Sequence, residues 1–369
     1  MFRIRLRFFL LFILLSNGWL HAQNWQELND SLSYYYERSD FNHAVPVARK
    51  IAAMAQKESG DSSESYGTAL NNLAFLQQKI KDNKAAEKNY REAMTIRFKL
   101  HSPEHVDCLS VVQGLSNVLL AQGQTNEAVK NYSTYLKKLE ESGKHQSEAG
   151  ILARYRRAEI FLESEIPEKA KTDLMVIAKA MNPMLADTIL YYNTFNFLTR
   201  VFGDEKNIII AEPYFLEHIR FCKWVDGEKS EEYVYALYRL AGLYSRGGRF
   251  DKAVPVMKQV LDGYKDLEGS LGTKYTAAVM NYATILLKVN QSKEADKTIT
   301  ELLESYKKEA GAESVAYEQI MYLAAMAYLQ GGEKQKGENS LDKCIETCRK
   351  LGTPELLMAR LLTLDSVYI

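Results

Sequence analysis

Two distant stretches of the chain are nearly the same: FNHAVPVARKI at residues 41–51 and FDKAVPVMKQV at residues 250–260. Both have the composition of a helix, yet each carries a proline near its middle. Both stretches contain an alanine at the same position, Ala44 and Ala253. A repeated unit has the same residue type at a constant spacing, so these two alanines can mark a repeat.

Small residues recur through the chain at an almost constant spacing. A step of 42 residues, shortened once to 41, joins eight positions that are all Ala or Gly: Ala44, Ala86, Ala128, Ala170, Ala211, Ala253, Ala295 and Gly337. Twelve residues before these positions lie Leu32 in the first unit and then Ala74, Ser116, Ala158, Thr199, Ala241, Ala283 and Ala325. Four residues after them lie bulky side chains from the second unit to the eighth: Tyr90, Tyr132, Leu174, Phe215, Met257, Ile299 and Leu341.

Two small residues in each unit allow two helices to cross at a short distance, because larger side chains would hold the backbones apart. Each unit is therefore predicted to be a helical hairpin, in which helix A is followed by helix B. Hairpins of this kind bury their apolar sides by stacking on their neighbours.

The prolines of the two opening stretches belong to one position of the repeat. Pro46, Pro213 and Pro255 all lie two residues after the small residue of helix B. A proline inside a helix costs about 3 kcal/mol, but the first four N–H groups of a helix have no partner within it. With Asn42 or Asp251 as the N-cap, Pro46 and Pro255 would be fourth residues and would cost no hydrogen bond. The repeated stretch is therefore predicted to begin helix B.

This pattern resembles the tetratricopeptide repeat. LYRLAGLYSRGGRFDKAVPVMKQVL at residues 237–261 is the closest match, with small residues in both helices and Gly248 in the turn between them. ALNNLAFLQQKIKDNKAAEKNYREAMTIRFKLHSPEH at residues 69–105 is similar to the long-helix subtype of kinesin light chains, as is the 42-residue period. The resemblance covers about residues 25–352, and it is weakest at IIIAEPYF, residues 208–215, which replaces the usual polar turn.

The resemblance implies an all-α fold, a right-handed α-solenoid superhelix of about eight hairpins within residues 23–352. PELLMARLLTLDSVYI reads as an amphipathic helix, so residues 353–369 are predicted to cap the open end, as solenoids require. The hairpin units are predicted near residues 25–62, 65–105, 106–146, 147–189, 190–228, 229–270, 271–312 and 313–352.

The first 22 residues differ from the rest. Three arginines precede a run of eight apolar residues, and a small residue, Ala22, follows shortly after. This order predicts a secretory signal peptide at residues 1–22, cleaved after Ala22, and therefore an exported protein, periplasmic or extracellular. The alternative is an uncleaved anchor, but eight apolar residues are too few where a bilayer requires about 20. No later segment is apolar enough for stable membrane insertion.

Charge and cysteine content exclude several other classes. The 47 basic and 47 acidic residues give a net charge of zero, and no basic stripe of the kind that nucleic-acid binding requires is present. Four cysteines, Cys108, Cys222, Cys344 and Cys348, are too few for a disulfide scaffold. Cys344 and Cys348 lie one helical turn apart, as a redox pair or as two small apolar residues.

The chain has no recognisable catalytic motif, neither H-E-x-x-H nor G-x-S-x-G. His101 and His105, with Glu104 and Asp107, could imitate a metal site, but they lie in a predicted turn, where polar residues are expected. GGEKQKG at residues 331–337 lacks the G-K-[ST] ending of a phosphate loop. We therefore predict no enzymatic activity, no cofactor and no metal.

In tetratricopeptide proteins helix A lines the inner wall, and extended peptides lie along it. Asn side chains can pair with a peptide backbone, Arg can hold carboxylates, and Tyr supplies rigid contact area. The alternative is that these side chains only satisfy neighbouring helices. The resemblance gives these candidate partner-binding residues: Asn71, Asn72, Phe75, Asn117, Tyr155, Arg156, Asn196, Arg200, Tyr238, Arg239, Asn281 and Tyr322.

The sequence thus favours an exported, non-enzymatic scaffold that binds a protein or peptide partner on the helix A surface. One alternative is a sensor or regulatory module of a signalling or protease system, whose effector is a separate chain or lies downstream. A second alternative is an envelope factor that binds glycan or assists assembly. The oligomeric state and the identity of the partner are left open by the sequence.

Overall fold

The computed structural model describes residues 18–181, 188–204 and 208–368. Within these residues the chain forms seventeen α-helices and one 3₁₀ turn, and it has no strand there. The predicted all-α class is confirmed. Residues 1–17 of the predicted signal peptide lie outside the described residues, and the first helix begins at Gly18, ahead of the predicted cleavage position.

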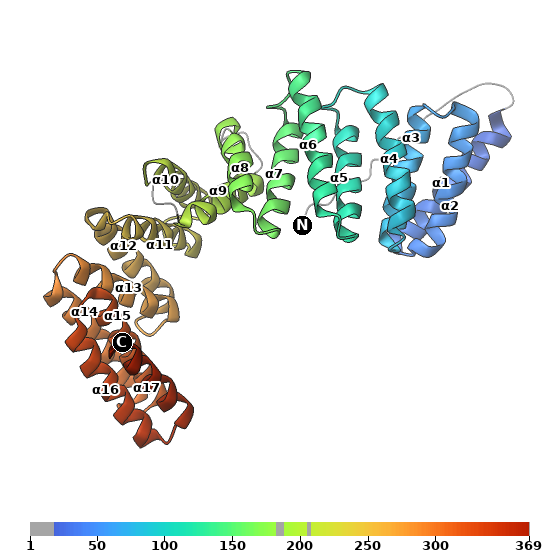
Figure 1. Ribbon diagram of the computed structural model, residues 1–369. Helices are drawn as coiled ribbons and strands as arrows, with labels where there is room; N and C mark the ends of the chain where they lie inside the picture. The colour runs from blue at the N-terminus through green and yellow to red at the C-terminus, as the bar shows by residue number, and fades with distance from the viewer. Residues whose placement is uncertain (1–17, 182–187, 205–207, 369) are drawn as a thin grey trace. The chain divides into compact units, whose positions relative to one another are not determined.

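The helices group into two compact units, Met1–Ala180 and Met181–Ile369. In the first unit, short turns connect four successive hairpins whose helices lie side by side (Figure 1). These helices are α1 (Gly18–Glu37), α2 (Phe41–Ser59), α3 (Glu64–Lys79), α4 (Asn83–Leu100), α5 (Val106–Ala121), α6 (Thr125–Glu141), α7 (Glu148–Glu163) and α8 (Pro167–Ala180).

The second unit holds four further hairpins among its described residues, followed by a final helix that packs on α16. An additional 3₁₀ turn, η1 (Phe202–Asp204), follows α9 in the hairpin where the usual polar turn is missing from the sequence. The helices are α9 (Thr188–Val201), α10 (Ile208–Val225), α11 (Glu231–Arg246), α12 (Phe250–Glu268), α13 (Thr273–Lys288), α14 (Ser292–Ala310), α15 (Val315–Gly331), α16 (Lys334–Leu351) and α17 (Pro354–Tyr368).

The repeated small residues lie where the two helices of each hairpin meet. All eight of the helix B series are buried, as are the seven of the helix A series and the bulky residues four positions further on. At Gly337 a Cβ atom would lie 2.5 Å from the Leu329 side chain and 3.2 Å from the carbonyl oxygen of Ala325. A larger residue at this crossing of α15 and α16 would require Leu329 to move and the two helices to separate slightly. The burial of these residues confirms the register predicted from the sequence.

Enlarging one of these residues should destabilise the protein. Ala253, in α12, is fully buried, and Ala253→Leu is expected to cost about 1–3 kcal/mol of unfolding free energy by overpacking the crossing with α11. Urea denaturation followed by circular dichroism measures this. Gln259→Leu, on the exposed side of the same helix, is the control, with an expected change within about 0.5 kcal/mol. Equal stability of both variants would contradict the register.

The three prolines lie deeper in helix B than predicted. α2, α10 and α12 begin at Phe41, Ile208 and Phe250, so each proline is the sixth residue of its helix, whereas Pro46 and Pro255 were predicted to be fourth residues. Each proline therefore does remove one backbone hydrogen bond. In all three helices the proline and the residue four positions before it are exposed, so the released carbonyl group can bond to water.

The prediction that Asn42 or Asp251 caps helix B was wrong. In α2 the cap is Asp40, whose side chain accepts a hydrogen bond from the backbone N–H of His43. In α12 the cap position is Arg249, which makes no side-chain cap bond. A capping residue must have a non-helical backbone, and the chain turns into the helix two residues earlier than the sequence suggested.

The final helix is held by a buried ion pair. Glu318 of α15 is fully buried, and Arg360 of α17 donates to both of its carboxylate oxygens, from Nε at 2.8 Å and from Nη2 at 3.2 Å. The same guanidinium group lies 3.6 Å from the centre of the Tyr322 ring. α17 thus closes the apolar side of the last hairpin, which agrees with its expected position at the end of the stack.

Candidate partner-binding surface

The candidate partner-binding residues lie on the first helix of successive hairpins, as the resemblance implied. In the first unit they belong to α3, α5 and α7, and in the second to α9, α11, α13 and α15. Their surroundings differ between the two units.

In the first unit most of these side chains are exposed or half-buried. Asn117 is exposed, whereas Asn71, Asn72 and Phe75 are half-buried, and the Oδ1 atom of Asn71 is buried without a hydrogen-bond partner. Phe75 has the ammonium group of Lys79 5.0 Å from its ring centre. The first unit therefore offers a largely uncharged surface along α3 and α5.

One of the two predictions for α7 needs correction. Tyr155 is only 6% exposed, so its ring belongs to the packed interior and cannot supply contact area to a partner. Arg156 is exposed, but its Nη1 donates to the carboxylate of Glu159 at 2.8 Å. Its charge is already balanced by an acid one helical turn away, which leaves little attraction for a carboxylate from outside.

In the second unit several candidates bond to one another across neighbouring helices. Nη1 of Arg239 donates to Oδ1 of Asn196 at 2.8 Å, which links α11 to α9. Asn281 of α13 donates to the hydroxyl of Tyr238 at 2.7 Å. Tyr322 is covered by the guanidinium group of Arg360, as described above. The alternative interpretation therefore holds in part for these residues, since their polar groups and rings contact side chains of neighbouring helices.

Three arginines of the second unit nevertheless lie close enough for their charges to interact. Burial and then repulsion from Arg200 and Arg246 lower the pKa of Arg239. Among the described residues, no carboxylate forms an ion pair with any of the three. Arg246 extends over Gly242, where a Cβ atom would be 3.2 Å from its Nη1. We call Arg200, Arg239 and Arg246 the arginine cluster.

Aromatic rings surround the arginine cluster. The guanidinium groups of Arg239 and Arg200 lie 5.7 Å and 5.8 Å from the ring centres of Tyr235 and Phe197. Tyr235 is exposed, and its ring stacks against Tyr238 with 6.5 Å between the centres. The surface therefore combines positive charge with rigid aromatic area, a combination that is common at protein interfaces.

A buried histidine lies behind this surface. His218 of α10 is 2% exposed, and its Nε2 has no hydrogen-bond partner. Burial, followed by repulsion from Arg239, lowers the pKa of His218 to about 4. The imidazole is therefore neutral at neutral pH, so it adds no further positive charge to the cluster.

Arg246 is not among the residues predicted from the sequence. The predicted groove positions extend only one residue beyond the small residue of helix A, and in α11 that last position is Gly242. Residues four apart on a helix share a face, so Arg246 lies on the face of Gly242 one turn later. Extending the groove by one helical turn would have found it.

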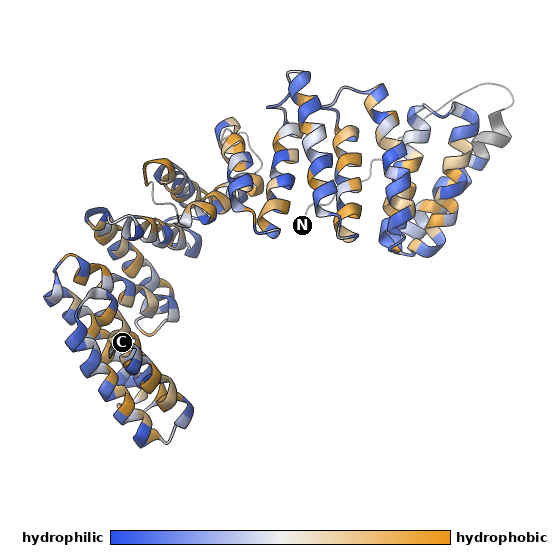
Figure 2. Cartoon of the chain, in the orientation of Figure 1, coloured by the Kyte–Doolittle hydropathy of each residue, from blue (hydrophilic) through white to orange (hydrophobic). Residues whose placement is uncertain are grey.

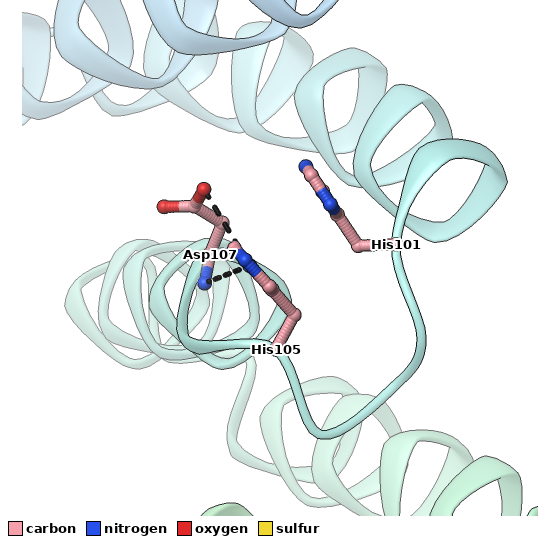
Figure 3. Close-up of side chains that lie close together, drawn as sticks. All are labelled: His101, His105 and Asp107. Carbon is pink, nitrogen blue, oxygen red and sulfur yellow. Dashed lines mark hydrogen bonds and ion pairs between the residues drawn. The ribbon is translucent and has the colours of Figure 1, made fainter. Parts of the chain in front are cut away.

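The histidine pair lies near Asp107 in the turn between α4 and α5, with an arrangement that does not suit a metal ion (Figure 3). His101, His105 and Asp107 place ligand atoms within 4.8 Å of one another. The two imidazole rings, however, are stacked at 4.1 Å with an interplanar angle of 9°. Ligand lone pairs lie in the ring plane, so parallel rings at this separation cannot both point at one ion about 2.0 Å away.

The same residues already have other partners. Nδ1 of His105 accepts the backbone N–H of Asp107 at 3.3 Å and so caps α5. The Asp107 carboxylate accepts from Nη1 of Arg97, a buried arginine, at 2.7 Å. Their arrangement supports the interpretation of this stretch as a turn and helix start.

All four cysteines are free and buried. Burial raises the pKa of the Cys344 thiol to about 12 and also raises that of Cys348. The thiolate is the reactive form of cysteine, so the pair behaves as two small apolar residues and the redox alternative receives no support.

Family comparison matches three parts of the chain. Residues 65–141, 236–270 and 318–350 each match a model described as "Tetratricopeptide repeat". The chain is a tetratricopeptide repeat protein. The matched segments hold the pairs α3–α4, α5–α6, α11–α12 and α15–α16, so the matches fall on hairpins.

Several solved structures resemble this tetratricopeptide repeat protein at low identity. The kinesin light chain-like repeats of Podosopora anserina share 13% identity, with 66% of this chain and 97% of that chain covered and a TM-score of 0.37. The apo form of RapI shares 13%, with 87% and 99% covered and a TM-score of 0.45. Aspartyl phosphate phosphatase F from Bacillus subtilis shares 12%, with 97% and 96% covered and a TM-score of 0.40.

Identities of 12–13% with TM-scores below 0.5 do not indicate a partner or an activity. No curated protein matches the sequence. The repeats themselves indicate the broad class of function. Tetratricopeptide repeats bind protein partners and generally serve as interaction or regulatory scaffolds, not as enzymes. In the part of the chain that the structure describes, no helix is long and apolar enough to cross a membrane.

Proposed function

We propose that this protein is an exported, non-enzymatic scaffold that binds an acidic segment of a partner protein along α9, α11 and α13. The observation that carries this proposal is the arginine cluster. Burial and then the charges of Arg200 and Arg246 lower the pKa of Arg239, and no carboxylate among the described residues pairs with any of the three. An incoming carboxylate would relieve this repulsion and form charge-assisted hydrogen bonds.

Other basic residues of the second unit form ion pairs with acids, in contrast to the arginine cluster. Lys252 pairs with Glu212 at 2.7 Å, and Lys336 pairs with Asp296 at the same distance. In a chain whose basic and acidic residues are equal in number, three neighbouring arginines that form no ion pair with a described carboxylate favour an acidic ligand.

The neighbouring side chains suit an extended segment. Tyr235 offers an exposed ring beside the cluster, and Asn281 is exposed on the adjoining helix α13. Asn has both donor and acceptor atoms for a peptide backbone, so the acidic side chains would be held by the arginines and the main chain by α13.

Export is the second part of the proposal, and it rests on the first 22 residues alone. A basic start, an apolar run and a small residue at the cleavage position favour a periplasmic or extracellular protein. The acidic partner would then be another protein of that compartment.

The acidic ligand is tested with Arg200→Gln/Arg246→Gln. Both side chains are exposed, so we expect the fold to be unchanged and affinity for an acidic peptide to fall by about tenfold or more, equivalent to about 1.4 kcal/mol. The measurement is fluorescence anisotropy of a labelled ten-residue peptide of alternating Glu and Gly, at low salt. A peptide with Gln in place of Glu should bind weakly to the unaltered protein.

The matched control is Arg156→Gln. Arg156 lies two residues before the small residue of α7, as Arg239 does in α11, but it is paired with Glu159. This variant should bind the acidic peptide as the unaltered protein does. Equal binding of the Glu and Gln peptides, or an unchanged affinity in the double variant, would refute the proposal.

A further inference from the structure

The outer side of α10 carries an exposed apolar stripe. Ile209, Leu216 and Trp224 are 83%, 49% and 65% exposed, and Pro213 and Arg220 lie between them on the same face. The spacing of these five residues is 4, 3, 4 and 4, which keeps them on one side of a helix. We call this set the α10 stripe, and orange residues are visible along α10 in Figure 2.

The repeat provides an internal comparison for this stripe. Where α10 has Ile209, the other second helices have only polar or charged residues: Asn42, Lys84, Asn126, Glu168, Asp251, Lys293 and Gln335. Where α10 has Trp224, the described second helices have Lys57, Lys99, Glu141, Asp266, Lys308 and Lys350. α10 therefore departs from a solvated pattern that the rest of the chain maintains.

The stripe is not a face that stacking within the array would bury. In α6, which has hairpins on both sides, four of the five corresponding residues, Asn126, Lys130, Lys137 and Glu141, are exposed, and the fifth, Ser133, is half-buried. The buried positions of α10 are those that other second helices bury, among them Ala211 and Phe215. An apolar outer face of this kind marks an interaction site.

The residues of the stripe are arranged symmetrically about one point. The midpoint between Ile209 and Trp224 lies between Leu216 and Glu217, and so does the midpoint between Pro213 and Arg220. If two copies of α10 lie antiparallel, Ile209 of each meets Trp224 of the other. A two-fold interface requires such self-complementarity, because the same patch serves both partners.

The charges near the centre of the stripe fit the same arrangement. Arg220 donates to Glu217 at 2.6 Å, so each copy brings one base and one acid to the middle of the face. Two antiparallel copies would place two acids and two bases together with no net charge. A lipid surface or a partner of one sign would gain nothing from this balance.

We propose that α10 pairs with α10 of a second copy of this chain, antiparallel and about a two-fold axis near Leu216. The spacing of 4 and 3 residues is the spacing of a seam between two packed helices. This dimer uses the outer side of a second helix, whereas the arginine cluster belongs mainly to first helices, so the two surfaces do not compete. The inference is independent of the proposed acidic ligand.

Disulfide trapping tests the geometry. Leu216→Cys places two thiols beside the axis, and mild oxidation should give a covalent dimer. Ile209→Cys is the matched control, because its two copies would lie about 22 Å apart along the helices, at 1.5 Å per residue, whereas a disulfide requires Cα atoms within about 7 Å. The native cysteines are buried and should not interfere.

Sedimentation equilibrium tests the strength of the pairing. Trp224→Glu should raise the dimer dissociation constant at least about tenfold, because it places a charge in the apolar seam. Lys308→Glu, at the corresponding position of α14, should leave it unchanged. Helical content by circular dichroism confirms that both variants fold. A monomer at about 100 μM with no cross-link at Leu216→Cys, or equal cross-linking at both cysteine positions, would overturn the proposal.

Discussion

Replacing Glu318 with alanine is expected to lower the unfolding free energy of the second unit by about 3–5 kcal/mol. Glu318 is fully buried and accepts two hydrogen bonds from Arg360. Its removal would leave the guanidinium group of Arg360 in the interior without a counter-charge. Because Arg360 belongs to α17, we expect this helix to detach and expose the last hairpin. Urea denaturation and hydrogen exchange of α17 amides measure both effects.

The double variant Glu318→Met/Arg360→Met separates the charge from the packing. It removes both ions at once, and burying apolar side chains of similar size is expected to restore most of the lost stability. If the double variant were as unstable as Glu318→Ala, the loss would come from packing and not from the unpaired charge. A cost below about 1 kcal/mol for Glu318→Ala would mean that the pair is solvated.

The second unit is also expected to lose about 3 kcal/mol of stability as the pH falls from about 6.5 to about 4. In the folded protein, burial and the nearby Arg239 lower the pKa of His218 to about 4. An unfolded chain binds a proton at this residue below about pH 6.5. The unfolded state therefore binds more protons throughout this window, and stability falls as the pH falls. Above pH 6.5 the residue has no effect.

Urea titrations between pH 7.5 and 4 measure this dependence. His218→Leu cannot be protonated, so the difference between this variant and the unaltered protein should change by about 3 kcal/mol across the window. His145→Leu is the control, since His145 is exposed, and it should retain the full acid sensitivity. Parallel curves for the unaltered protein and His218→Leu would show that the buried imidazole is protonated without cost.

The packing of the helices could be predicted from the sequence because it depends on residue size. A small side chain such as Ala253 is needed wherever two helices cross closely, and this need recurs with every hairpin. The starts of helix B could not be placed with the same accuracy. Asp40 and Asn42 are both good caps, and the choice between them depends on backbone angles that residue preferences do not fix.

The candidate surface was only partly predictable. Register placed the side chains on the correct helices, but it does not determine which partner each of them selects. Arg239 and Asn196 are 43 residues apart, and their hydrogen bond depends on how two hairpins stack. The pairing of Arg156 with Glu159, by contrast, could have been expected, because residues three apart on a helix are neighbours.

Tyr155 shows that residues at the same position of the repeat can differ in burial. It lies three residues before the small residue of its helix, as Asn71 does in α3, yet Asn71 is half-buried and Tyr155 is buried. A large ring at an edge position can turn into the packing, whereas a short polar side chain gains little by doing so. The sequence shows that IIIAEPYF, residues 208–215, lacks the usual polar turn. The apolar outer face of α10 follows only from the exposed fractions of its side chains.

The crossings at Ala253 and its equivalents make each hairpin an interchangeable module. Duplication or loss of one whole period would leave the crossing within each remaining hairpin intact, since the small residue of helix B recurs in every hairpin. The array can therefore lengthen or shorten in evolution by single hairpins, because each hairpin brings its own buried helix crossing. The length of the surface formed by the first helices would change in the same steps.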